Sequence, residues 1–137
     1  MPLLLSPSTL STAGVLLLTI VAVESGGWYM LRLIRGGRSA TPFQIAFSRA
    51  GHAHAGVLVI LSLVVQLYAD AAALTGIAGS LARSAVPLAA ILMPAGFFIA
   101  AAGRGRTEPN RFIWLVYAGA VSLAVGVITL GLGLLLR

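Results

Sequence analysis

The residues best suited to chemistry lie in the stretch FSRAGHAHAG, residues 47–56, where Arg49, His52 and His54 fall within six residues. On a helix, a rotation of about 100° per residue turns the two imidazoles to diverging faces, so they cannot bind one metal ion together. A helical metal pair needs i and i+4 spacing. The chain has only two histidines and no cysteine, so one copy cannot form a three-histidine centre. His52 remains as the single candidate metal ligand.

Glu24 is the second candidate, in the apolar sequence VAVESGGWYM, with Trp28 on about the same helix face. A carboxylate at this depth in a bilayer must be protonated, paired or exposed to a watery cavity. Arg49 and His52 are the expected partners. Two interpretations stay open: a polar clasp between the first and second helices, or a protonatable, ligand-binding group in a cavity.

Gln66 falls on the same face as His52, so the expected ligand-binding set is Glu24, Trp28, Arg49, His52 and Gln66. Asp70 follows one turn later, at the end of the apolar run, where we expect it to be solvated. A proton or small-ion pathway through Glu24, Gln66 and Asp70 is a further alternative.

The segment SRAGHAHAGVLVIL resembles the arginine–x–x–histidine opening of the haem-bearing second helix in the haem-copper oxidase and nitric oxide reductase superfamily. The resemblance covers about a tenth of the chain and implies that Arg49 matches the arginine and His52 the haem ligand. That superfamily has more helices and several more histidines. Haem binding here would need a dimer, a partner chain, or Met30 or Met93 as the second ligand.

Composition predicts a membrane protein. Of 137 residues, 59% are hydrophobic and 9% are charged, and the mean hydropathy is +1.03. Soluble domains carry roughly 25% charged residues, so most of this surface must contact lipid or protein partners. The formal charge is +6, but all nine basic residues are arginines and most of them lie in two short segments between apolar runs. This pattern indicates membrane topology, and we expect no nucleic-acid binding.

Four stretches reach the roughly 20 apolar residues needed for a helical span, and none shows the alternation of a membrane β-strand. We therefore predict an all-α, polytopic membrane protein, a four-transmembrane-helix bundle with short loops and one domain, 1–137. The expected helices are about 9–34, 42–75 with the membrane span from about 51, 84–103 and 109–136. The first ten residues lack a basic n-region and a cleavage site, so we expect the first helix to be retained.

The arginines also predict the orientation. Seven lie in or beside the connections between the first and second and the third and fourth helices, and two lie at the other side. The seven are Arg32, Arg35, Arg38, Arg49, Arg104, Arg106 and Arg111, and the two are Arg83 and Arg137. The positive-inside rule then places the arginine-rich loops in the cytoplasm and both termini outside a cell (inner) membrane.

Helix ends and small residues complete the pattern. TPFQ, residues 41–44, predicts a helix start with a capping box, and TEPN, residues 107–110, predicts another, with Glu108 in its first turn. The fourth span carries small residues on one face, which favours close helix packing against the bundle or a second copy. They are Gly119, Ser122, Gly126, Thr129 and Gly133.

The sequence contains no Ser–His–Asp arrangement and no phosphate-binding loop, so we assign no catalytic residue. The favoured function is a non-catalytic accessory or interaction subunit of a membrane complex, with a polar site near Glu24, Arg49 and His52. A haem- or small-ligand-binding protein using His52 for redox chemistry or sensing is the alternative. The expected partners are the lipid bilayer and a membrane protein or a second copy.

Overall fold

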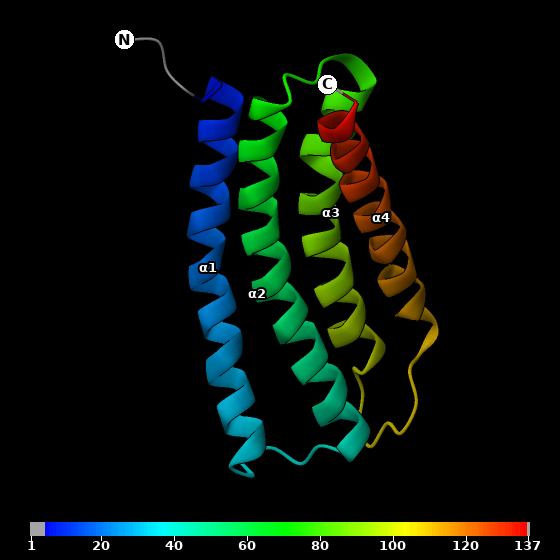
Figure 1. The fold of residues 1–137 in the computed structure, drawn as a ribbon. Coiled ribbons are helices and arrows are strands. Elements are labelled where there is room, and N and C mark those ends of the chain that lie inside the picture. Colours follow the sequence, from blue (N-terminus) through cyan, green and yellow to red (C-terminus); the bar gives the residue numbers. More distant parts are fainter. Residues whose placement is uncertain (1–4, 137) are drawn as a thin grey trace.

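The computed structural model describes residues 5–136 and consists of four long helices joined by short connections (Figure 1). They are α1 (Pro7–Ile34), α2 (Pro42–Ala71), α3 (Gly76–Ala100) and α4 (Trp114–Leu135), with a 3-10 turn, η1 (Arg111–Ile113), leading into α4. The described part contains no strand, and all four helices are long and apolar enough to cross a membrane. The predicted all-α, four-helix membrane fold is confirmed.

The observed helix bounds differ most from expectation at α3. This helix begins at Gly76 rather than near Ser84, so Arg83 lies inside it and not in a connection. Gly76 and Gly79 have low helix propensity, so this extension depends on tertiary contacts: Ala82 is fully buried in the core and Arg83 pairs with Asp70. α2 ends at Ala71, before the expected 75. α4 begins at Trp114 rather than near 109, and the preceding turn η1 has Asn110 as its N-cap, whose side chain accepts from Phe112 N–H at 2.9 Å. Glu108 therefore precedes the first turn.

The start of α2 is a capping box, as its sequence predicts. The Thr41 hydroxyl accepts from Gln44 N–H at 3.2 Å, and Gln44 Oε1 accepts from Thr41 N–H at 3.1 Å. The same residues hold the α3–α4 connection. Thr41 Oγ1 donates to the Arg106 carbonyl, and Gln44 Nε2 donates to the Ala101 and Gly103 carbonyls at 2.9 and 2.7 Å. The two arginine-rich connections are thus joined at one end of the bundle (Figure 1).

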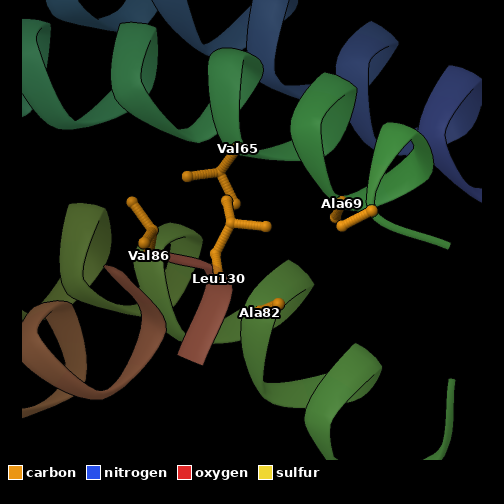
Figure 2. Packing of buried hydrophobic residues seen from close by; sticks show 6 residues of the cluster. Val65, Ala69, Ala82, Val86 and Leu130 are labelled. Atoms are coloured by element: carbon orange, nitrogen blue, oxygen red, sulfur yellow. The ribbon is translucent and has the colours of Figure 1, made fainter. Parts of the chain in front are cut away.

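The core lies among α2, α3 and α4. Its largest cluster of buried apolar residues combines two residues of α2, its C-cap Ala72, two residues of α3 and Leu130 of α4 (Figure 2). The α2 and α3 members shown are Val65, Ala69, Ala82 and Val86. Small side chains bring the backbones together here, as is usual where membrane helices pack without a strong hydrophobic driving force.

α1 lies at the edge of this arrangement. It packs along α2, and none of its Cα atoms comes within 8 Å of a Cα of α3 or α4. Only four of its residues are buried, namely Thr9, Leu16, Met30 and Leu33. The bundle is therefore open between α1 and α3, and α2 lies behind this opening.

Candidate site at His52 and the outer face of α1

His52 packs against a glycine pair on α1. A Cβ atom added to Gly26 would lie 3.1 Å from His52 Nδ1, and one added to Gly27 would lie 3.6 Å from His52 Cε1. Any larger side chain at Gly26 would have to displace the imidazole. The half-buried His52 side chain forms no hydrogen bond with another described residue. Its ring nitrogens therefore remain available to a ligand.

His54 turns to the opposite side of α2, as the helical rotation predicts. Its Nδ1 lies 2.7 Å from the Ala50 carbonyl, and its ring centroid is 5.0 Å from that of Phe97 on α3. The two imidazoles thus contact different helices. Among residues 5–136 no group of three or more His, Cys, Asp or Glu side chains could hold a metal ion.

A groove of about 400 Å³ runs between α1 and α3 and has His52 at its floor. α1 lines it from Thr12 to Gly26, and α3 lines it from Pro87 to Phe98. Thr12, Thr19 and His52 are its polar residues, and the rest of the lining is apolar or glycine. Gln66 is not part of this lining, so the groove holds only His52 of the expected ligand-binding set.

A second, polar pocket of about 520 Å³ lies at the arginine-rich end. Arg38, Ser39, Gln44 and Ser48 contribute to its wall, together with residues 101–103 of the α3–α4 connection. Gly26 and Phe98 line both cavities, so the groove and the pocket adjoin there. The lining of the polar pocket includes no carboxylate.

Glu24 and Trp28 lie on the outer surface of α1. Both are exposed, Trp28 by 65%, and they border a shallow notch formed entirely by α1 residues. Glu24 forms no ion pair or side-chain hydrogen bond within residues 5–136, and Arg49 is also exposed and unpaired there. The structure does not bring Glu24 together with Arg49 or His52 in the polar clasp that the sequence suggested.

Asp70 belongs to a polar network and is not a freely solvated residue. Its Oδ1 lies 2.7 Å from Arg83 Nη2, and its side chain is only 10% exposed. Ser6 donates to the same carboxylate from its backbone N–H at 2.7 Å and from its hydroxyl at 2.9 Å. Arg83 also donates to Thr9 Oγ1 at 2.9 Å. The expectation of a solvated Asp70 was wrong because α3 begins early enough to carry Arg83 to it.

Gln66 is fully buried and donates from Nε2 to the Arg83 carbonyl at 2.7 Å. That carbonyl would normally accept from residue 87, but Pro87 has no N–H. Gln66 therefore satisfies a helix carbonyl that the proline leaves without a donor. Gln66 and Asp70 thus share the Arg83 network, whereas Glu24 faces outward, and the three residues form no continuous path.

The small face of α4 packs against α3. A Cβ on Gly119 would meet Met93, with the Met93 backbone nitrogen at 2.9 Å, and one on Gly126 would lie 2.8 Å from Val86 Cγ2. Ser122 donates to the Ala85 carbonyl at 2.8 Å. Gly133 adjoins Leu74, and Thr129 is half-buried. The small residues thus pack inside the chain rather than presenting a free surface.

The groove supplies one possible haem ligand. Met30 and Met93, the other candidates from the sequence, are buried and do not line it. Met93 instead packs against Gly119. His52 could hold a haem iron on one side only, and a second axial ligand would have to come from outside the described residues.

No protein-family model, curated protein or solved structure is significantly similar to the chain.

Sequence reasoning missed three features of the site. Pro87, four residues after Arg83, was the available signal for the orphaned carbonyl that Gln66 satisfies. The adjacent Gly26 and Gly27 were the signal for a bulky neighbour on the facing helix. Arg38 was used only as one of the arginines that predict the orientation, because nothing local in the sequence shows that it lines a pocket with Gln44 and Ser48.

Proposed function

We propose that the protein is a non-catalytic interaction subunit of a membrane complex, and that it binds its partner through the outer face of α1. The observation that carries this proposal is the exposed carboxylate of Glu24 near the middle of an apolar helix, which has no ion-pair partner among residues 5–136. A charged side chain facing acyl chains is costly by any measured scale. A partner helix that supplies a cation or a hydrogen-bond donor removes that cost.

The surroundings of Glu24 suit a helix partner. Val21, Trp28 and Leu31 give the notch apolar walls, and Ser25 and Gly27 keep it shallow. Small residues allow another backbone to approach closely, and a polar group within such a contact gives it specificity. We therefore expect a transmembrane helix carrying Arg, Lys, His or an amide side chain at the depth of Glu24.

A second copy of this chain fits the same face less well. Copies inserted with the same orientation and related by a two-fold axis would place one Glu24 opposite the other. Two carboxylates at this depth repel each other unless one is protonated. Charge complementarity thus favours a different protein over a homodimer.

Site-specific photocrosslinking in native membranes tests the proposal. A benzophenone amino acid replaces Trp28 or, as a matched control on α4, Tyr117, since both side chains are 65% exposed. We expect a discrete adduct with another membrane protein from position 28 and none from position 117. Glu24→Ala should abolish the adduct, whereas Glu108→Ala, which removes an exposed acid from a loop, should leave it unchanged.

Three results would overturn the proposal: an adduct of twice the protein's own mass as the sole product, equal adducts from both positions, or labelling of lipid alone.

A further inference from the structure

We propose that the groove between α1 and α3 and the adjoining polar pocket together bind one anionic phospholipid. An acyl chain lies in the groove, and the phosphate lies in the pocket beside Arg38. The groove shares no lining residue with the notch at Glu24, because Glu24 and Gly26 are two residues apart and point about 200° from each other around α1. Ser25 borders both the notch and the polar pocket.

The groove has the lining and length that an acyl chain requires. Most of its surface comes from apolar side chains of α1, α2 and α3, among them Leu16, Val59 and Ile91. From Thr12 to Gly26 the α1 wall extends about 21 Å, at 1.5 Å per residue. One leaflet of the hydrocarbon core is about 15 Å thick. The groove can therefore hold a chain over the depth of its leaflet.

The pocket has the charge that a phosphate requires. Arg38 is the charged residue of its lining, and Ser39 and Ser48 add hydroxyl groups that can donate hydrogen bonds. The Arg38 guanidinium carbon lies 6.0 Å from the centroid of the Tyr29 ring, which also lines the pocket. Without a carboxylate in the wall, an anion meets no like charge there.

The junction between the two cavities carries a polar group of its own. Gly26 and Phe98 line both cavities, and the His52 imidazole, which has no hydrogen-bond partner among residues 5–136, adjoins Gly26. In a phospholipid, the ester carbonyls lie between the phosphate and the chains. His52 is thus positioned to donate a hydrogen bond to the ester region, and Gly26 and Gly27 leave room for its imidazole.

The relative positions of the pocket and the groove also match those of the headgroup and the acyl chain of a lipid in one leaflet. The pocket is lined by residues of both arginine-rich connections, and the groove runs from Gly26 along α1 to Thr12. A phospholipid can enter sideways through the opening between α1 and α3 with its headgroup already at the correct depth.

Native mass spectrometry and thermal unfolding of the intact protein in mild detergent test this proposal. The probes are long-chain phosphatidylglycerol, phosphatidylcholine with the same chains, and inorganic phosphate. We expect one retained phosphatidylglycerol that raises the unfolding temperature, with weak retention of phosphatidylcholine and no effect of phosphate. Stabilisation by phosphate alone, or equal retention of both lipids, would contradict a specific binding site for an anionic phospholipid.

Matched variants locate the site. Arg38→Gln should weaken phosphatidylglycerol binding about fivefold, the equivalent of one basic residue near an anionic headgroup, whereas Arg35→Gln, outside the pocket, should not. Ala22 is exposed in the groove, so Ala22→Phe adds bulk there without entering the core, and it should abolish retention. The control Ala124→Phe adds the same bulk to the exposed surface of α4.

Two further outcomes would overturn the assignment. Equal binding by Arg38→Gln and Arg35→Gln, or by the two phenylalanine variants, would show that the lipid binds elsewhere. A Soret band in the purified protein that is lost in His52→Ala would show that the groove holds haem instead.

Discussion

At the scale of single residues, Gln66 shows how a polar group can be essential to a membrane helix bundle without forming a ligand site. Pro87 removes the N–H that would bond to the Arg83 carbonyl, and Gln66 from the neighbouring helix supplies the missing donor at 2.7 Å. An unsatisfied carbonyl in an apolar environment is costly, so the two residues depend on each other.

The dependence can be measured by a double-mutant cycle. Gln66→Leu should destabilise the protein by about 1–3 kcal/mol, because it leaves the Arg83 carbonyl unpaired. In a Pro87→Ala background the helix donor is restored, so the same substitution should cost clearly less. Denaturation in detergent provides the free energies. The control background is Pro94→Ala, the other proline within α3, and an equal loss in both backgrounds would disprove the coupling.

At the scale of elements, the closest packing in the molecule is between α3 and α4, where glycines of α4 leave no room for a Cβ. At Gly119 an added Cβ would meet both the side chain and the backbone of Met93. The backbone cannot move aside as a flexible side chain can, so α4 would have to shift away from α3. Gly131, on the same helix, has no atom within 4 Å of the added Cβ.

Gly119→Ala should therefore destabilise the protein by about 1–3 kcal/mol through overpacking. Gly131→Ala introduces the same chemical change at an open position and should be neutral or slightly stabilising, because alanine favours the helix. Thermal unfolding of the two variants in the same detergent compares them directly. A similar loss of stability in both would show that α3 leaves room for a Cβ at Gly119.

At the scale of the whole molecule, the two arginine-rich connections share one end of the bundle, and the first turn of α1 and the last turn of α4 share the other (Figure 1). The early start of α3 also changes the status of one arginine used to predict the orientation. Arg83 lies within α3 and is neutralised by Asp70 at 2.7 Å, and Arg137 lies outside the described residues. The difference in unpaired positive charge between the two ends still predicts that the arginine-rich connections are cytoplasmic.

Reporter fusions test that orientation. Alkaline phosphatase, which is active outside the cytoplasm, should be active when fused after Leu136 and inactive when fused in the connection at Arg104. A fluorescent protein that matures in the cytoplasm should give the opposite pattern. Activity of the phosphatase at Arg104 would place the arginine-rich end outside and contradict the positive-inside assignment.

The fold could be predicted because it depends on properties that repeat along the chain. Each apolar run is long enough to span a bilayer, and the capping box at Thr41 is a local pattern. The early start of α3 was missed because residues 76–83 include Gly76, Gly79 and Ser80, residue types that are common in loops and have low helix propensity. The surroundings of His52 and Glu24 were missed because they depend on the rotation and tilt of α1 against α2, and the sequence of neither helix determines that alone.

The packing of each helix on its neighbour in sequence has a consequence for biogenesis. α1 lies along α2, α2 packs on α3, and α3 packs on α4. As the ribosome delivers the helices in turn, each one enters a bilayer that already holds its main neighbour, so no helix has to wait for one made much later. The Asp70–Arg83 ion pair can form once the third helix is inserted, and the Asp70 carboxylate also accepts hydrogen bonds from Ser6. These contacts stabilise the position of the first helix before the fourth helix is made.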